Sequence, residues 1–337
     1  MKTADTMTVE DLAGQRIMAG FDGTGMNDDL AHLIEDVRVG GLILFSQNIR
    51  TPDQVADLCR SAQERARESG CPPLLMAVDQ EGGVVARLKA PHFTEFDGNP
   101  SMAGPEDADR FALTTAGELL SVGLNMDMAP VMDVAPPAAE SVMTNRVFGT
   151  SPGHVAEMGT AVIRGLQRSG VMAVAKHFPG IGRTLLDSHL DRPVFSEPAE
   201  SIHAFDLPPF KAAIDANVAG IMLSHIVYDQ LDPLWPASLS PIVARDLLRA
   251  KMGYQGVVMT DDLDMGAIVN HYDIDTVVHQ ALEADIDLVL ICHKGPNIDL
   301  ACRKIQERLR RNAHMKQRGI DAARRLLDLK ARYIDPV

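Results

Sequence analysis

Eight short apolar runs alternate with amphipathic helical windows along this chain, and this alternation constrains the fold more than any other feature. Nearly all-apolar strands separated by helices are typical of a parallel sheet that is covered on both faces. The predicted strands are Arg16–Phe21, Gly41–Phe45, Leu74–Val78, Leu124–Met128, Val171–Ala175, Gly220–Leu223, Gly256–Thr260 and Ile286–Ile291. The predicted helical windows include Pro52–Glu68, Glu106–Val122, His154–Arg168, Asp206–Ala216, Ser240–Lys251, Asp275–Ala284 and a long C-terminal stretch from Asn297 to Tyr333.

Eight strands are the number that closes a barrel, and the 337 residues of the chain suit one barrel with insertions. We therefore predict an α/β fold, a single-domain (β/α)8 TIM barrel with some irregular strands, spanning residues 1–337. Segments 130–147 and 178–200 are expected to be long loops at its active face. The alternative is an open doubly wound sheet, but no Gly-rich phosphate fingerprint follows the first strand.

Charge and apolar patterning exclude several classes of partner. The formal net charge of −14 argues against nucleic acid and anionic membrane surfaces, and no apolar run approaches the ~18 residues that span a membrane. Met1–Asp5 lacks the layout of a secretion signal, which favours a cytoplasmic location. Cys59, Cys71, Cys292 and Cys302 show no zinc-ligand spacing and are expected to be reduced thiols. We expect no cofactor and no metal, and a monomer or weak oligomer.

The segment Lys176–His189, which reads KHFPGIGRTLLDSH, concentrates polar chemistry on a Gly/Pro-rich loop after the fifth strand. Asp187 and His189 are two residues apart, so in an extended segment both side chains leave on the same side. A carboxylate beside an imidazole can fix its tautomer and raise its basicity, which makes a proton carrier. Taken alone, such a pair is more typical of a surface turn. The rest of the chain must therefore decide its role.

Polar side chains follow most of the predicted strands, where barrel enzymes place their chemistry. They are Ser46, Asn48 and Arg50; Asp79, Gln80, Glu81 and Arg87; Asp127, Asp133, Asn145 and Arg146; Lys176 and His177; Ser224 and His225; Asp261 and Asp262; and Cys292, His293 and Lys294. Asp127, Asp133, Asp262 and His225 could equally be structural braces. Together the set predicts an active site for a polyhydroxylated ligand, because carboxylates and Arg or Lys clamp adjacent hydroxyls in pairs.

Glycoside cleavage through a covalent intermediate needs a carboxylate nucleophile and a second group that serves as acid and then as base. Asp261 directly follows the apolar run 256–260, so it is well placed to be the nucleophile on a rigid strand. His189, oriented by Asp187, could carry the proton. These two roles predict a glycosidase.

Several motifs at these positions resemble those of the glycoside hydrolase family 3 β-N-acetylhexosaminidases of the NagZ type. They are GLILF at 41–45, DQEGG at 79–83, APVMDV at 129–134, RVFG at 146–149, KHFPG at 176–180, DSH at 187–189 and TDDL at 260–263. Their order and spacing cover roughly residues 10–330.

The resemblance implies a retaining mechanism with Asp261 as nucleophile and His189, paired to Asp187, as acid/base. It also implies sugar-binding roles for Asp79, Arg87, Arg146, Lys176 and His177. The implied substrate is a small-molecule sugar, a terminal β-linked N-acetylglucosamine, typically in cell-wall muropeptides with a 1,6-anhydro-N-acetylmuramic acid leaving group. The chain is thus expected to act in peptidoglycan recycling.

Two residues depart from the family loop, which commonly reads Gly-His-Gly followed by a small or acidic residue. Ile181 and Arg183 stand there instead. Arg183 either forms a salt bridge within the protein or contacts an anionic leaving group. Neither departure touches the proposed nucleophile or the Asp187–His189 pair.

Alternative functions remain open at this point. A neutral imidazole repels phosphate less than a carboxylate would, so the same site could serve a glycoside phosphorylase, or a broader β-glycosidase. The changed loop weakly favours a non-catalytic sugar sensor. A metal-dependent hydrolase with zinc on His177, His189 and Asp187 is disfavoured, because neither an H-x-H nor an H-E-x-x-H pattern occurs. The sequence distinguishes neither N-acetylglucosamine from glucose nor one aglycone from another.

Overall fold

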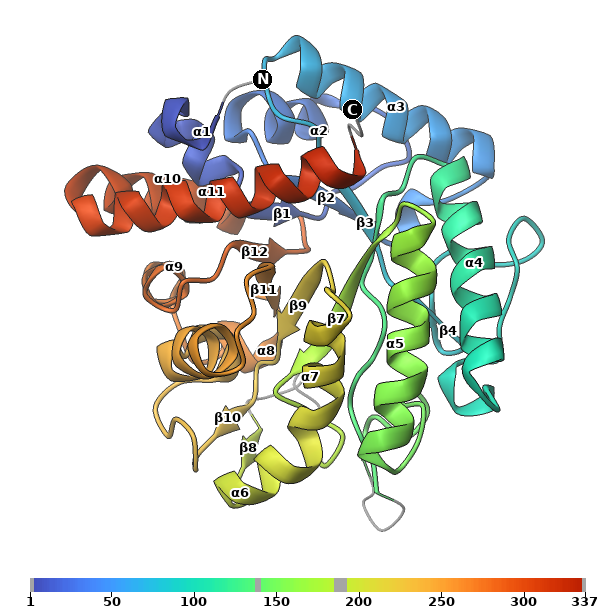
Figure 1. The fold of residues 1–337 in the computed structure, drawn as a ribbon. Coiled ribbons are helices and arrows are strands. Elements are labelled where there is room, and N and C mark those ends of the chain that lie inside the picture. The colour runs from blue at the N-terminus through green and yellow to red at the C-terminus, as the bar shows by residue number, and fades with distance from the viewer. Residues whose placement is uncertain (1–2, 137–140, 185–192, 335–337) are drawn as a thin grey trace.

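Eight parallel strands form a closed barrel in the computed structural model, which describes residues 3–136, 141–184 and 193–334. Around the barrel the strand order is β1-β12-β11-β9-β7-β6-β3-β2 (Figure 1). The strands are β1 Ile17–Ala19, β2 Gly41–Leu44, β3 Leu75–Val78, β6 Met126–Asp127, β7 Met172–Phe178, β9 Gly220–Leu223, β11 Val257–Asp262 and β12 Leu288–Ile291. Each predicted strand contains or overlaps one of them, so the (β/α)8 prediction is confirmed.

The barrel closes because the first strand pairs with both the second and the last. Met18 of β1 lies opposite Gly41 of β2 on one side and opposite Leu290 of β12 on the other. All residues of β1, β2 and β12 are buried. These apolar runs are therefore covered on both faces, as the lack of polar alternation predicted.

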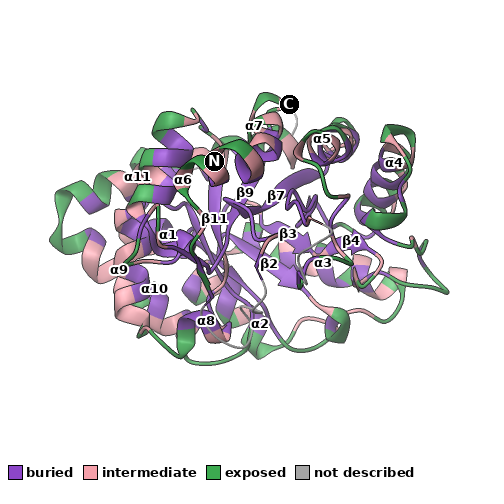
Figure 2. Ribbon diagram, turned by 90° about the horizontal axis from the view of Figure 1, so that it is seen from below, coloured by how far each residue is buried: buried purple, intermediate pink, exposed green. Residues whose placement is uncertain are grey.

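Helices surround the strands, with buried faces turned inward and exposed faces outward (Figure 2). The longer ones are α3 Pro52–Glu68, α4 Pro105–Ser121, α5 Pro152–Arg168, α7 Leu207–Asp215, η7 Ile242–Lys251, α9 Ile274–Glu283, α10 Asn297–Arg311 and α11 Ala313–Tyr333. Shorter ones are η1 Ala4–Thr6, α1 Val9–Gly14, α2 Asp28–His32, η2 Leu33–Val37, η3 Ser46–Asn48, η4 Asn99–Ser101, α6 Ala199–Ser201, η5 Ile202–Asp206, η6 Ala237–Leu239 and α8 Gly266–Val269.

Local sequence signals explain where several helices begin. The hydroxyls of Thr51 and Ser151 accept the backbone N–H groups of Gln54 and His154 in the first turns of α3 and α5, and a proline follows each cap residue. The long C-terminal stretch predicted from Asn297 is wrong in one respect, because it is two helices. Asn312 interrupts it, and its side chain accepts the backbone N–H groups of His314 and Met315 to cap α11.

Within the part of the chain that the structure describes, two small sheets lie outside the barrel. β4 Gln80–Gly82 and β5 Val85–Ala86 form an antiparallel hairpin directly after β3. β8 Val194–Phe195 pairs with β10 Val227–Tyr228 in parallel. The hairpin continues the chain from the carboxyl end of β3, so it holds the residues that follow this strand at the mouth of the barrel.

The barrel interior is a packed apolar core. Helix α11 closes this core at the end of the barrel where the strands begin. Leu326 and Leu329 of α11 join the cluster formed by inward residues of the strands, such as Met18, Met126 and Met172. α11, red in Figure 1, crosses that end of the barrel. Among the described residues, no helix is long and apolar enough to cross a membrane.

Candidate active site

A cavity of about 440 Å³ opens at the carboxyl ends of the barrel strands. Six of the eight residues to which the sequence analysis gave a catalytic or sugar-binding role line it together: Asp79, Arg87, Arg146, Lys176, His177 and Asp261. They come from the ends of β3, β7 and β11, from the hairpin and from the segment after β6. Asp187 and His189 lie outside the described residues. The volume of the cavity suits a small ligand such as one sugar.

Lys176 and His177 lie within strand β7, whereas the sequence analysis placed them in the loop after it. β7 runs on to Phe178, and its register against β9 shifts between Ala175 and Phe178. The peptide bond between Lys176 and His177 is cis. Both side chains contact polar groups of the site, although successive residues of a regular strand point to opposite faces. The expectation failed because the predicted strand was taken from the apolar run, which ends at Ala175 before the polar Lys176.

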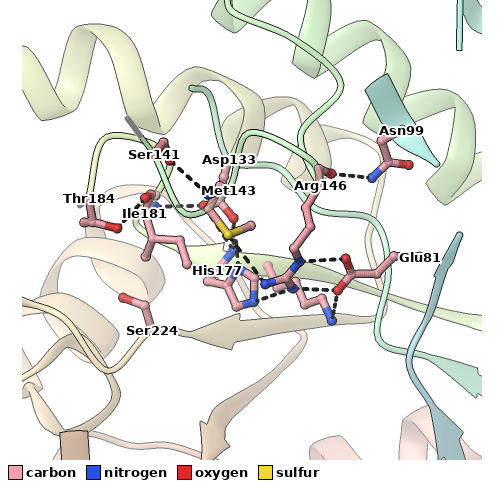
Figure 3. Close-up of polar contacts among 12 residues, drawn as sticks. Glu81, Asn99, Asp133, Ser141, Met143, Arg146, His177, Ile181, Thr184 and Ser224 are labelled. Atoms are coloured by element: carbon pink, nitrogen blue, oxygen red, sulfur yellow. Dashed lines mark hydrogen bonds and ion pairs between the residues drawn. The ribbon is translucent and has the colours of Figure 1, made fainter. Parts of the chain in front are cut away.

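Glu81 joins two cations of the cavity wall. Its carboxylate accepts two hydrogen bonds from Arg146, Nε at 2.9 Å and Nη2 at 2.7 Å, and Lys176 Nζ lies 2.7 Å from Oε1 (Figure 3). Glu81 is 2% exposed. The sequence analysis noted Glu81 but gave it no role. The two-residue spacing of Asp79 and Glu81 after a buried strand was the signal that could have found it.

Asp79 bridges Lys176 and the more exposed Arg87. Lys176 Nζ lies 2.8 Å from Oδ1 of Asp79, and Arg87 Nη2 lies 3.4 Å from Oδ2. The Arg87 guanidinium also lies over the Phe45 ring, 5.6 Å from its centroid, at a distance where cation–π attraction acts. Asp79 therefore holds two cations at the cavity wall.

Mutual attraction keeps this cluster ionised in spite of its burial. Burial acts to raise the pKa of Asp79, but Lys176 and Arg87 outweigh it and lower that pKa to about 2. The pKa of Glu81 is likewise lowered, against burial, by Lys176 and Arg146. Burial acts to lower the pKa of Lys176, yet Asp79 and Glu81 raise it. At neutral pH the wall thus presents two carboxylates and three cations.

Asp133 orients His177. The fully buried carboxylate accepts a hydrogen bond from Nδ1 of His177 at 2.8 Å and another from the Ile181 backbone N–H at 2.8 Å (Figure 3). Because the Asp133 carboxylate holds Nδ1, the other ring nitrogen, Nε2, is turned toward Arg146 and lies 3.4 Å from its Nη2. Asp133 is therefore a brace, but one that fixes the orientation of a cavity residue.

Asp261 lies near the end of β11 and is ionised. Burial acts to raise its pKa, but the neighbouring His225 and His177 outweigh this effect and the pKa is lowered. The backbone N–H of Asp262 donates to Asp261 Oδ1 at 2.8 Å. Ionisation and attachment to a strand are both properties that a carboxylate nucleophile needs.

The sequence left the roles of three further residues open. In the structure, two of them brace neighbouring segments and one lines the cavity. Asp127 accepts the Gln80 N–H at 3.0 Å, and burial raises its pKa well above the ordinary value, so it is a buried brace. His225 links two segments through Ser238 Oγ at 2.7 Å and the Asp262 carbonyl at 2.8 Å. Asp262 lines the cavity itself.

Ile181 and Arg183 are both built into the protein. Ile181 is buried in the main core. Arg183 pairs with Asp206 and with Glu197, at 2.9 Å for the latter, and its guanidinium lies 5.0 Å from the ring centroids of Phe195 and Phe205. Of the two roles considered for Arg183, the structure shows the salt bridge within the protein.

Comparison with known proteins identifies the family. The profile of the glycosyl hydrolase family 3 N-terminal domain matches residues 8–329. The chain belongs to glycosyl hydrolase family 3. It is a glycoside hydrolase, as the motifs predicted. A curated relative, the β-hexosaminidase of Alkalilimnicola ehrlichii, is 34% identical over 300 residues, which cover 86% of this chain and 84% of the relative.

Solved structures of family 3 proteins share the barrel. A β-N-acetylglucosaminidase from Paenibacillus sp. FPU-7 superposes with a TM-score of 0.93 at 37% identity, covering 97% of this chain and 63% of that protein. A β-N-acetylhexosaminidase from Beutenbergia cavernae superposes with a TM-score of 0.89 at 30% identity, covering 96% of this chain and 99% of the other. This chain therefore spans nearly the whole length of the Beutenbergia protein but less than two thirds of the Paenibacillus protein.

Proposed function

We propose that this chain is a retaining exo-β-N-acetylglucosaminidase that releases a terminal β-linked N-acetylglucosamine. The observation that carries the proposal is an ionised Asp261 on a barrel strand, in the same cavity as the charged wall of Asp79, Arg87, Arg146 and Lys176. The names of the Paenibacillus and Alkalilimnicola relatives support the choice of sugar.

In the proposed reaction Asp261 attacks the anomeric carbon and forms a covalent glycosyl ester. His189, paired to Asp187, gives its proton to the departing glycosidic oxygen. It then takes a proton from water, which attacks the ester and restores the free Asp261 carboxylate. Retention follows because the anomeric carbon is inverted twice.

The charged wall would hold the sugar hydroxyls. Asp79 can accept hydrogen bonds from two adjacent hydroxyls, and Arg87, Arg146 and Lys176 can donate to them. His177, fixed by Asp133, presents Nε2 toward the same space. Such paired contacts select a pyranose ring and place its anomeric carbon against the nucleophile.

We also propose a muropeptide substrate with a 1,6-anhydro-N-acetylmuramic acid leaving group, and a cytoplasmic role in peptidoglycan recycling by a single catalytic domain. Buried cysteines such as Cys59, Cys292 and Cys302 suit a reducing compartment. Comparing this substrate with β-GlcNAc, β-Glc, β-GalNAc and β-Xyl nitrophenyl glycosides tests the sugar and the aglycone together. Faster turnover of the glucoside would contradict the sugar assignment.

Replacing the nucleophile tests the mechanism. Asp261→Ala is expected to lower turnover of 4-nitrophenyl β-N-acetylglucosaminide by several powers of ten. Azide can fill the vacated space and should restore release of nitrophenol from this variant, with the α-glycosyl azide as product. Rescue shows that the variant is folded. Turnover near the wild-type rate without azide would refute the role of Asp261.

The acid/base pair is tested through the leaving group. His189→Ala should slow the cleavage of an alkyl glycoside far more than that of a 2,4-dinitrophenyl glycoside, which needs no protonation to leave. Equal loss on both substrates would remove His189 from this role. Assaying with inorganic phosphate separates the phosphorylase alternative, because only a phosphorylase yields N-acetylglucosamine 1-phosphate.

A further inference from the structure

A second group of ligating side chains lies at the mouth of the barrel, beside Asp261. We propose that Asp262, Asp264 and His293 form a binding site for a divalent transition-metal ion of the Zn²⁺ type, and that the bound ion inhibits hydrolysis. The inhibitory part of this inference rests on the proposed glycosidase function. The binding part does not depend on it.

The three residues bring their ligand atoms close together. Nδ1 of His293 lies 3.5 Å from Oδ2 of Asp262 and 3.7 Å from Oδ2 of Asp264, and ligand atoms of the three residues all lie within 4.8 Å of one another. These separations exceed a normal N–H···O hydrogen bond. Zinc bonds of ~2.1 Å place neighbouring ligands of a tetrahedron ~3.4 Å apart, which is close to the two distances from His293 Nδ1.

Surrounding groups already orient the two carboxylates. Oδ1 of Asp262 accepts the backbone N–H groups of Asp264 and Cys292, each at 3.0 Å. Oδ1 of Asp264 accepts from Asn297 Nδ2 at 2.9 Å, and its Oδ2 accepts the His293 N–H at 3.1 Å. Such outer contacts fix ligand direction in metal sites. They leave Oδ2 of Asp262 turned toward the imidazole.

Burial differs across the group in a way that suits an exchangeable ion. The side chains of Asp262 and Asp264 are 14% and 13% exposed, whereas His293 is 75% exposed. The carboxylates provide a fixed half of the site, and the imidazole can swing to complete it. Two carboxylates with one imidazole favour Zn²⁺ over Mg²⁺, which prefers six oxygen ligands in a regular octahedron.

An ion here would oppose the reaction. Asp261 precedes Asp262 in β11 and lines the same cavity as Asp262, Asp264 and His293. Glycoside cleavage develops positive charge at the anomeric carbon. A divalent cation beside the nucleophile repels that charge and weakens the attacking carboxylate through their Coulomb attraction. The ion therefore raises the barrier.

Calorimetry with ZnCl₂ tests binding on chelator-treated protein. Wild type and Asp261→Ala should each bind one ion at this site, which makes the result independent of turnover. His293→Ala should weaken zinc binding at least ~10-fold, the range for disturbing a metal site, and MgCl₂ should not compete. The matched control is His32→Ala. His32 also contacts two carboxylates, Asp36 at 2.8 Å and Asp299 at 2.9 Å, but through opposite ring nitrogens.

Because His32 cannot bring both carboxylates to one ion, its loss should leave zinc binding unchanged. Equal weakening in the two variants, or no weakening in His293→Ala, would overturn the proposal. In activity assays, zinc should lower wild-type turnover and a chelator should restore it. His293→Ala, compared with its own metal-free rate, should lose this inhibition. Undiminished inhibition in that variant would place the inhibitory ion elsewhere.

Discussion

The two ends of this barrel carry buried charge clusters of the same composition, two carboxylates and three cations, and they differ in what surrounds them. The cluster at the cavity contains Asp79, Glu81, Arg87, Arg146 and Lys176. The cluster at the amino-terminal end, here called the base cluster, contains Asp285, Asp287, Arg16, Arg249 and Arg325.

Protein groups satisfy the carboxylate at the centre of the base cluster. Asp287 is fully buried, and it accepts from Arg249 Nη2 at 2.6 Å, the Val258 N–H at 2.8 Å and Arg325 Nε at 2.8 Å. Arg16 donates to the Ile286 carbonyl, and burial lowers its pKa to about 10. The network ties β11, β12, η7 and α11 together, so its role is to stabilise the fold.

The cavity cluster instead faces a space that a ligand can enter. Arg87 holds Asp79 only at 3.4 Å, and the cations Arg87, Arg146 and Lys176 all line the cavity. The comparison teaches that charge composition does not separate a binding site from a structural network. What separates them is whether the cluster lines a cavity that a ligand can enter or ties strands and helices together inside the fold.

A substitution in the base cluster should have its largest effect on the free energy of unfolding. Asp287→Asn leaves Arg249 and Arg325 without their shared carboxylate, so we expect the free energy of unfolding to fall by ~3–5 kcal/mol. Urea unfolding measures it, and the kcat/KM of the folded protein should not change. Asp246→Asn, which breaks an exposed pair with Arg245, is the control and should cost under ~1 kcal/mol. If Asp287→Asn lost activity but kept its stability, the proposed difference between the two ends of the barrel would be wrong.

A substitution in the cavity cluster should have its largest effect on kcat/KM. Glu81→Gln removes the charge that positions Arg146 and Lys176, and a displaced contact of this kind costs ~100-fold in kcat/KM. Steady-state kinetics gives the value, and urea unfolding should show a smaller loss than for Asp287→Asn. Arg146→Lys keeps the charge but loses the two-pronged contact, and it should also lower kcat/KM. Unchanged kinetics in both variants would make this cluster structural too.

Lys330 of α11 makes the free energy of unfolding depend on pH, which gives the comparison a further test. This α11 residue is 2% exposed and donates to Gln15 Oε1 at 2.7 Å, and burial lowers its pKa to about 7. The unfolded chain keeps its proton up to about pH 10.4. Between these values the unfolded state binds more protons, so the free energy of unfolding should rise with pH by up to ~1.4 kcal/mol per unit.

Below pH 7 this contribution should level off, because both states are then protonated. Lys330→Met should remove the slope and raise stability near pH 7 by ~2 kcal/mol or more, whereas Lys316→Met, at an exposed position of the same helix, should change neither. Unfolding curves at pH 7, 8 and 9 test this. An unaltered slope in Lys330→Met would assign it to other groups.

The smallest expected effect concerns the support of Arg146. Asn99 donates from Nδ2 to the Arg146 carbonyl at 2.7 Å, and its loss in Asn99→Ala should cost ~1 kcal/mol, seen as a fall of a few-fold in kcat/KM. Ser101→Ala breaks a hydrogen bond of equal length to Gly98 within the same turn. The serine variant should leave kcat/KM unchanged. Equal effects would show that Asn99 acts on the loop rather than on Arg146.

The sequence predicted the barrel well because strands buried on both faces must be apolar, so runs such as Gly41–Leu44 are visible without any partner. Asp79 and Asp261 were found because they directly follow such runs. The role of Glu81 was missed because its partner Arg146 is 65 residues away. The base cluster was missed for a related reason. Asp287 was included in the predicted strand Ile286–Ile291, whereas β12 begins at Leu288, and nothing in the local pattern marks Asp287 as part of a charge cluster.

The shifted register of β7 has a consequence for protein design. The residues before Ala175 pack the barrel, whereas Lys176 and His177 serve the cavity side by side only where the strand departs from regular pairing. A designer who wished to graft this site onto another barrel could not transplant the two side chains alone. The irregular stretch of backbone would have to be carried with them, so the portable unit is a distorted strand rather than a set of residues.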